Sequence, residues 1–272
     1  MESLITMQHI LPEIPILPFW AIAALFVFAR YLVTAGGIYL IFYVWMQRKL
    51  GHLKIKPEAP GRRQVFAEMR HSFYTAVIFA GMATLVHVLK EFGYTRQYAE
   101  IETYGLGYLL FSMALLVVLH DAYFYWMHRL MHHLRLFRVI HKVHHQSFNP
   151  TPMASFSFHP LEAFLEFGIV PLIVLIIPVH PLAMLFFANW SMVFNILGHL
   201  GYELFPRGFV RHRFWGWMNT STHHNLHHQQ GNYNFGLYFN FWDRMMGTNH
   251  PQYAETFDQV KSHSQNYMHP AA

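Results

Sequence analysis

Long apolar segments separated by short polar loops dominate the chain. They occur at 19–47, where Arg30 interrupts the run, and at 72–89, 105–127, 161–179 and 182–197. A membrane-spanning helix needs about 20 predominantly apolar residues, with a range of roughly 17–25. The pattern therefore predicts an all-α integral membrane protein with about four transmembrane helices.

Two of these segments are irregular. The stretch 31–47, which follows Arg30, is just long enough to span a bilayer, and 19–29 either extends it or lies at the interface. Residues 161–197 contain three prolines, and proline inside an apolar run ends or kinks a helix. We therefore expect two shorter helices there that turn at "PVHP", either crossing the membrane as a bent hairpin or dipping in and returning.

Charged residues are scarce and unevenly distributed. They make up 12% of the 272 residues, whereas 54% are hydrophobic; a soluble domain has about 25% charged residues. Basic residues gather in 48–71 and 128–160, while 90–104 mixes acids and bases. Because cytosolic loops carry the excess of Lys and Arg, we expect 48–71, 128–160 and 198–272 in the cytosol. The net charge of +5 then reflects topology rather than nucleic-acid binding.

Histidines cluster at helical spacing in the segments assigned to the cytosolic side. Residues three and four apart share one face of a helix, so each cluster can direct two or three imidazoles at one spot. The three boxes are His128/His132, His141/His144/His145 and His224/His227/His228. Eight imidazoles exceed what one tetrahedral zinc ion uses, and the chain has no cysteine to offer a thiolate. The boxes therefore predict a two-metal site on a cytosolic helical cap.

Other polar residues near the boxes extend the candidate site. His199 follows the last apolar segment and is a ninth candidate ligand, and His120, His159 and His223 are further candidates. A ligating imidazole normally donates its other N–H to a carboxylate or carbonyl. The acids near the boxes are Asp121, Glu162, Glu203 and Asp243. We expect these acids to orient the ligands, and ordinary ion pairing or helix capping is the alternative for each.

Imidazole binds zinc, copper, iron and nickel, and three functions are consistent with such a cage. An all-nitrogen site at a membrane, without a nucleophilic serine or an HExxH motif, favours oxygen chemistry. A zinc-dependent lipid hydrolase would need an open metal position and a general base, which Glu162 or Glu203 could supply. A metal-handling membrane protein usually holds its ligands near the bilayer midplane rather than at the ends of spans.

Three sequence blocks carry a family resemblance. They are "HDAYFYWMHRLMHH", "HKVHHQSFNPTPMASFSFHPLEA" and "STHHNLHHQQGNYNFGLYFNFWDRMMGT". Together they resemble the fatty acid hydroxylase/sterol desaturase superfamily, in particular its sterol C5-desaturase branch and bacterial relatives. The resemblance divides the chain into three parts. Residues 1–104 are expected to form N-terminal membrane helices and a basic cytosolic loop, 105–248 the fatty acid hydroxylase-like catalytic domain, and 249–272 a polar C-terminal tail.

The resemblance implies a non-haem di-iron enzyme that uses O₂ as co-substrate and external electrons to hydroxylate or desaturate a C–H position of a sterol-like or fatty acyl lipid. The ligands it implies for two iron ions are His128, His132, His141, His144, His145, His199, His224, His227 and His228. The chain has no length for a fused cytochrome b5 domain and no cysteine for an iron–sulfur cluster. We therefore expect a separate electron donor, cytochrome b5-like or ferredoxin-like with its reductase. The expected location is the bacterial inner membrane or the endoplasmic reticulum, with the active site on the cytosolic side and no nucleic-acid partner.

Overall fold

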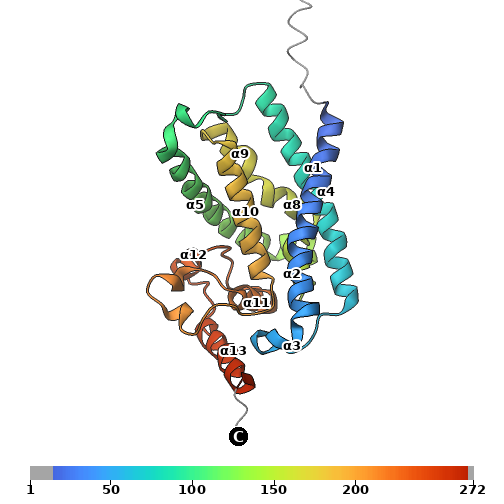
Figure 1. The fold of residues 1–272 in the computed structure, drawn as a ribbon, viewed down its shortest axis with the longest axis vertical. Helices are drawn as coiled ribbons and strands as arrows, with labels where there is room; N and C mark the ends of the chain where they lie inside the picture. Colours follow the sequence, from blue (N-terminus) through green and yellow to red (C-terminus); the bar gives the residue numbers. More distant parts are fainter. Residues whose placement is uncertain (1–14, 269–272) are drawn as a thin grey trace, which may run out of the picture.

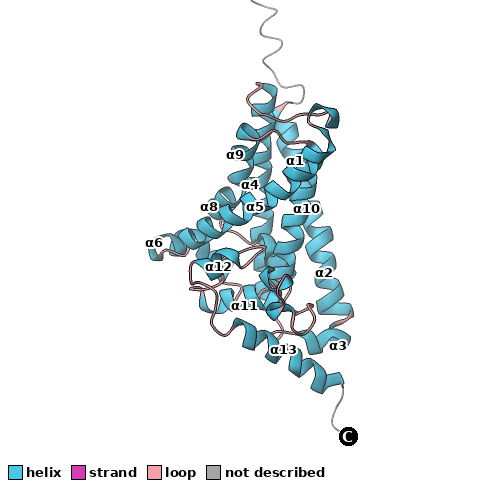
Figure 2. Cartoon of the chain, turned by 90° about the vertical axis from the view of Figure 1, so that its left-hand side faces the viewer, coloured by secondary structure: helices cyan, strands magenta, loops and turns pink. Residues whose placement is uncertain are grey.

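The computed structural model describes residues 15–268, and only the backbone of 263–268. All regular structure among these residues is helical, and no β-strand forms there. The helices are α1 (Ile16–Tyr31), α2 (Gly37–Tyr39), α3 (Gln47–Leu50), α4 (Arg62–Glu91), α5 (Gly105–Met131), α6 (Leu134–Leu136), α7 (Lys142–His145), α8 (Pro160–Phe167), α9 (Ile169–Ile176), α10 (Pro181–Gly198), α11 (Ser221–Gln230), α12 (Phe241–Met245) and α13 (Tyr253–Met268). The long helices run side by side, and α11, α12 and α13 gather at one end of them (Figures 1 and 2).

Four helices are long and apolar enough to cross a membrane, as the hydropathy pattern predicts. They are the continuous run Ile16–Trp45, which contains α1 and α2, and the helices α4, α5 and α10. One π-helical segment joins α1 to α2, and a second continues the run from α2 to Trp45. The hydroxyl of Thr34 donates to the carbonyl of Arg30 at 2.7 Å. The helix therefore continues through Arg30, and the apolar stretch before Arg30 extends the span.

The proline-containing segment before α10 forms a bent pair of short helices. At about 1.5 Å per residue, neither eight-residue helix, α8 or α9, can cross a hydrocarbon core of about 30 Å. In succession they lead from the end of the molecule that holds α11 to the opposite end, where α10 begins (Figure 1). The turn between α9 and α10 meets the loop after α4, because the N–H of Tyr98 donates to the carbonyl of Val179. This crossing brings the end of α10 back to the end of α5.

Within the C-terminal segment 249–272, predicted from its polar composition to be a tail, Tyr253–Met268 form a helix whose first turns pack against the protein. Tyr253, Phe257 and Val260 are buried at spacings of four and three residues, which is the apolar stripe of an amphipathic helix. The hydroxyl of Tyr253 donates to Thr220 at 3.1 Å. The helix α13 therefore covers α11, and composition alone hid this stripe; residues 269–272 lie outside the described part of the chain.

Candidate metal centre

Nine histidines meet in two adjacent groups where α5, α7, α10 and α11 come together. The first group has five histidines and the second has four, and within each group one nitrogen per ring lies within 4.8 Å of the others. The first group is His128, His132, His141, His145 and His227; the second group is His144, His199, His224 and His228. These are the nine ligands predicted from the sequence, and the structure brings all of them together.

In the second and third boxes, adjacent histidines belong to different groups. His144 and His145 on α7 divide between the second and first group, and His228 and His227 on α11 divide in the same way. Successive residues on a helix point about 100° apart, so a helix lying between two centres contributes to both. The second and third boxes therefore each supply both groups, whereas the first box, His128/His132, supplies the first group alone; we expected each box to address one spot. The eight residues from Ser221 to His228 are all buried, so α11 runs through the centre of the site.

Hydrogen bonds fix the orientation of several of these rings. The Nδ1–H groups donate as follows: His128 to the Phe235 carbonyl at 2.8 Å, His199 to the Asn195 carbonyl at 2.7 Å, His227 to the Tyr233 carbonyl at 2.7 Å, His144 to the Ser157 carbonyl at 3.3 Å, and His141 to the Glu162 carboxylate at 2.6 Å. An oxygen opposite Nδ1 requires the proton on that nitrogen, so Nε2 carries a free lone pair. Five rings thus direct an unprotonated nitrogen into the groups.

The facing Nε2 atoms are arranged as metal ligands. The Nε2 atoms of His128 and His141 lie 3.1 Å apart. The Nε2 atom of His199 lies 3.0 Å from the Nε2 atom of His224 and 3.2 Å from that of His228. Lone pairs at this separation repel one another unless a cation lies between them. Two nitrogens bound at about 2.1 Å to one ion and at about a right angle lie about 3 Å apart. The residues therefore fit two metal ions, one in each group.

Burial keeps these imidazoles neutral. It lowers the pKa of His199 to about 4, and together with neighbouring imidazoles it lowers the pKa of His145 to about 3. The same two causes lower the pKa values of His224, His227 and His228 well below the ordinary value. A neutral imidazole is the form that binds a metal ion, so protons do not compete for these nitrogens at neutral pH.

Of the four predicted orienting acids, Glu162 alone bonds to a ring of the two groups. It lies on α8, is fully buried, and its carboxylate accepts the N–H of His141 at 2.6 Å. Such a carboxylate fixes the tautomer of the ring and raises the basicity of the ligating nitrogen. Glu162 therefore positions His141 for the first group.

Replacing Glu162 with leucine is expected to weaken metal binding about 10- to 100-fold, because His141 loses the acceptor that orients it. Titration of metal-free protein with Fe²⁺ under anaerobic conditions measures this affinity. Glu58→Gln, which alters an exposed acid in the loop before α4, is the control. Equal affinities in the Glu162→Leu variant and the native protein would contradict a positioning role.

Asp121 and Asp243 act on the loop between α11 and α12 rather than on a ring. The carboxylate of Asp243 accepts the backbone N–H groups of Phe235 at 2.9 Å and Gly236 at 2.8 Å, and that of Asp121 accepts the N–H of Tyr238 at 2.9 Å. Burial raises the pKa of Asp243 to about 6, against the opposing effect of these N–H donors. Both acids therefore hold in place the loop whose carbonyls receive His128 and His227.

Sequence reasoning missed this loop as part of the site. Its contribution is two backbone carbonyls, which no side-chain motif reveals. The signal that could have found it is Gly236, where a Cβ atom would collide with the carbonyl oxygen of Phe239 and press against Asp243. Two residues earlier, Asn234 has a φ of 60°, in the left-handed region. The "NYNFG" sequence thus folds into a tight turn that presents its carbonyls to the histidines.

Glu203 caps a helix, which was the alternative reading for the predicted acids. Its carboxylate accepts the backbone N–H of Thr222 at 3.0 Å and its hydroxyl at 2.7 Å. These groups belong to the first turn of α11, where a carboxylate satisfies free N–H groups. Glu203 therefore fixes the start of the helix that supplies three histidines of the two groups.

Three further candidate ligands lie outside both groups. His120 accepts or donates a hydrogen bond with the Tyr238 hydroxyl at 2.7 Å. His159 caps α8, because its Nδ1 accepts the N–H of Leu161. His223 is buried 3.6 Å from the carboxylate of Asp243 and belongs to neither group. The structure does not support these three as ligands, since each ring points at other groups.

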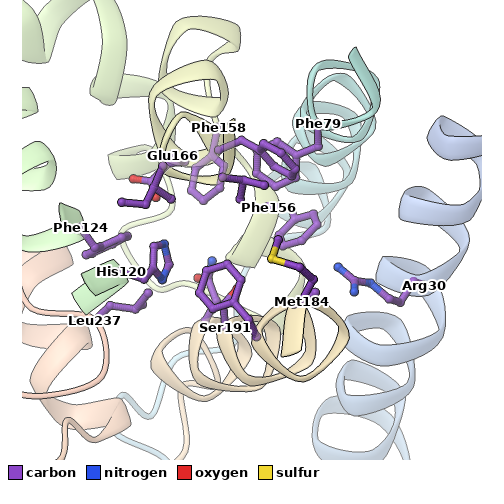
Figure 3. A pocket seen from close by; sticks show the side chains of 16 residues that line it. Arg30, Phe79, His120, Phe124, Phe156, Phe158, Glu166, Met184, Ser191 and Leu237 are labelled. Atoms are coloured by element: carbon purple, nitrogen blue, oxygen red, sulfur yellow. The ribbon is translucent and has the colours of Figure 1, made fainter. Parts of the chain in front are cut away.

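A cavity of about 130 Å³ lies between the membrane helices. Two of the aromatic rings that line it also contact histidines, one in each group. Phe124 and Phe158 line it (Figure 3). Their ring centroids lie 5.1 Å from that of His128 and 5.2 Å from that of His144, respectively. Phe79, Phe156, Phe167 and Phe187 also line the cavity, together with aliphatic and a few polar residues. The cavity can therefore hold an apolar group next to the histidines and away from water.

Comparison with known proteins identifies the relatives of this site. Residues 113–248 match the sequence profile of the fatty acid hydroxylase family. A Delta(7)-sterol 5(6)-desaturase of Gibberella zeae is 31% identical over 80% of this chain and 64% of that protein. The lathosterol oxidase of Homo sapiens is 28% identical over 80% of this chain and 73% of that protein. A Delta(7)-sterol 5(6)-desaturase of Aspergillus fumigatus is 30% identical over 79% of this chain and 72% of that protein.

The chain spans less than two thirds of the Gibberella zeae relative. No solved structure matches the chain significantly.

Proposed function

The chain belongs to the fatty acid hydroxylase/sterol desaturase superfamily, and on that premise we propose that it is a membrane-bound non-haem di-iron oxygenase. Its substrate would be a sterol-like or fatty acyl lipid, oxidised at one C–H position with O₂ and two external electrons. The observation that carries the proposal is the pair of adjacent histidine groups, with nine nitrogens directed inward. The relatives are named as sterol desaturases and a lathosterol oxidase, which favours an oxygenase over a hydrolase or a metal-handling protein.

Hydroxylation and desaturation of the lipid consume the same inputs, one O₂, two electrons and two protons. Hydroxylation converts the C–H bond, O₂, two electrons and two protons into an alcohol and one water. Desaturation removes two hydrogens from adjacent carbons and yields an alkene and two waters from the same inputs. Two iron ions, when bound by the nine histidines, would supply the activation of O₂.

The chain itself supplies position and a dry environment. The carboxylate of Glu162 and the carbonyls of Phe235 and Tyr233 hold three rings of the first group. The rings of Phe124 and Phe158 line the cavity and also contact the rings of His128 and His144. Exclusion of water and alignment of one C–H bond are the contributions that a protein makes to such chemistry.

Metal analysis tests the proposal. Protein produced in ⁵⁷Fe medium is expected to contain about two irons per chain that are magnetically coupled in the Mössbauer spectrum. The double variant His144→Ala/His227→Ala removes one ligand from each group and should lose both ions. Lipid product should then require O₂ and a reductant together. Tightly bound zinc, with no iron even after anaerobic reconstitution, would contradict the oxygenase and favour the hydrolase.

A separate electron donor completes the proposal. Arg135, Arg138 and Lys142 are exposed on the segment that carries His141, at helical spacing. These cations lie at the end of the molecule that we assign to the cytosol, because the basic loops are there. They would attract an acidic donor, cytochrome b5-like or ferredoxin-like, close to the first group.

Reversing two of these charges tests the donor surface. Arg138→Glu/Lys142→Glu is expected to lower the donor-dependent rate roughly tenfold at low salt, whereas the rate with dithionite should stay the same. Arg96→Glu, in the exposed loop after α4 at the opposite end, is the control. A double variant that accepts electrons from the protein donor at the native rate would contradict this surface.

A further inference from the structure

Arg30 is a cation in the middle of a membrane-spanning helix. It is the fifteenth of the 30 residues from Ile16 to Trp45, and its guanidinium points from α1 into the cavity (Figure 3). Among the described residues no carboxylate lies within 4.0 Å of it, and its buried Nε has no hydrogen-bond partner. A charged residue without a partner inside a membrane is costly and indicates a functional site.

The cavity has two distinct ends. In Figure 3, Arg30 and Met184 lie at one end, and His120, Phe124 and Leu237 lie at the other. Phe124 contacts His128 of the first group, so the end with Phe124 faces the histidines and the end with Arg30 faces away. A ligand that spans the cavity therefore has one part beside the metal site and another part beside a guanidinium.

The walls between these ends are apolar. Phe79, Phe156 and Phe158 line the middle of the cavity. Its volume of about 130 Å³ is close to that of dry cavities of about 150 Å³ that bind a benzene-sized group. This space holds the oxygen-bearing end of a lipid with an adjoining ring or short length of hydrocarbon, and the rest of the molecule lies outside it; a bulky lipid headgroup has no room there.

The other polar groups of the cavity limit the charge that a ligand can carry. The carboxyl group of Glu166, from α8, lies nearer the end with Phe124, and Ser191 and Asn195 on α10 are neutral. One cation and one carboxyl group share the cavity, so a small oxygen-bearing group suits Arg30 better than a multiply charged one. A guanidinium offers five N–H donors and no acceptor, which selects a ligand oxygen that accepts hydrogen bonds.

We propose that the cavity binds one end of an amphipathic lipid, with the oxygen of that end against Arg30 and the adjoining hydrocarbon against Phe124 and Phe158. That the hydrocarbon is then oxidised rests on the proposed function; the binding does not. The oxygen belongs either to the hydroxyl of a sterol-type alcohol or to the carboxylate of a fatty acid, and both accept hydrogen bonds from a guanidinium. Arg30 thereby sets which carbon of the lipid lies beside the histidines.

Binding to metal-free protein tests the proposal. Scintillation proximity measurements on the full chain in detergent would use two matched pairs of tritiated probes, cholestan-3β-ol with cholestane and octadecanoate with octadecane. The native protein is expected to bind the oxygen-bearing member of one pair at least tenfold more tightly than its hydrocarbon. Arg30→Met should abolish this difference, and Arg30→Lys, which keeps the charge, should retain most of it. Arg48→Met, which removes an exposed cation beyond the same helix, should leave it unchanged.

The pair that shows the difference identifies the source of the oxygen. Native protein that binds both oxygen-bearing probes no better than their hydrocarbons would overturn the proposal, and this comparison requires no folded variant. An Arg30→Met protein that keeps the native thermal unfolding midpoint and the full difference would also overturn it. A retained difference in a protein that forms no O₂-dependent product would contradict the oxygenase and leave the Arg30 contact standing.

Discussion

Replacing His228 with alanine is expected to remove the iron of the second group and leave the first occupied, whereas His227→Ala should do the reverse. The two residues are adjacent on α11, yet their rings enter different groups. The Nε2 of His228 lies 3.1 Å from that of His224, and the Nε2 of His227 lies 3.1 Å from that of His145. Each substitution therefore takes one nitrogen from one centre only.

Iron content and the Mössbauer spectrum measure the outcome. Both variants should retain about one iron per chain, now uncoupled, and should lose most of the lipid oxidation rate, because the proposed reduction of O₂ uses both ions. His133→Ala, which alters an exposed histidine beside His132 and outside both groups, is the control. Loss of both irons from either single variant would show that the two groups do not hold their ions independently.

Replacing Asp243 with alanine is expected to produce the largest loss of stability away from the ligands. The carboxylate is fully buried and accepts two backbone N–H groups and the hydroxyl of Thr248 at 2.8 Å. A buried donor left without an acceptor costs about 1–3 kcal/mol, so the free energy of unfolding should fall by about 3–5 kcal/mol. Release of the loop should also free the Phe235 carbonyl that orients His128.

The thermal unfolding midpoint in detergent should accordingly fall by on the order of 10 °C, with preferential loss of iron from the first group. Asp243→Asn, which keeps one acceptor oxygen, should be intermediate. Asp258→Ala removes an exposed carboxylate that pairs with Arg211 at 2.9 Å and should change stability by less than about 1 kcal/mol. Equal midpoints for Asp243→Ala and Asp258→Ala would contradict the structural role of Asp243.

Local periodicity made much of the fold predictable. The lengths of the apolar runs identify the four long helices, and their alternation brings the three histidine boxes to one end of the molecule. The same reasoning failed for α13, because its apolar stripe of Tyr253, Phe257 and Val260 is diluted by polar neighbours. It could not reveal that Arg30 lies in a continuous helix facing a cavity, since that depends on how α1 packs against the others.

The candidate site was predictable in its residues and not in its arrangement. Helical spacing indicates which histidines share a face, but the division of His227 and His228 between two groups depends on where α11 lies relative to α5, α7 and α10. The carbonyls of Tyr233 and Phe235 are backbone groups, which any residue type provides. Of the acids, only Glu162 reaches a ring of the two groups in the described part of the chain, because the others are used by backbone N–H groups.

With iron as the proposed metal, the buried stretch Ser221–His228 of α11 makes folding depend on the supply of iron. Its sequence "STHHNLHH" has little hydrocarbon to stabilise a core, and the ring nitrogens it buries repel one another until a cation is bound. Metal binding is then part of the free energy of folding. Chains made during iron starvation are therefore expected to stay incompletely folded and to be degraded by the proteases that remove such states. Iron would thus set how much of the protein accumulates, as well as how fast each copy works.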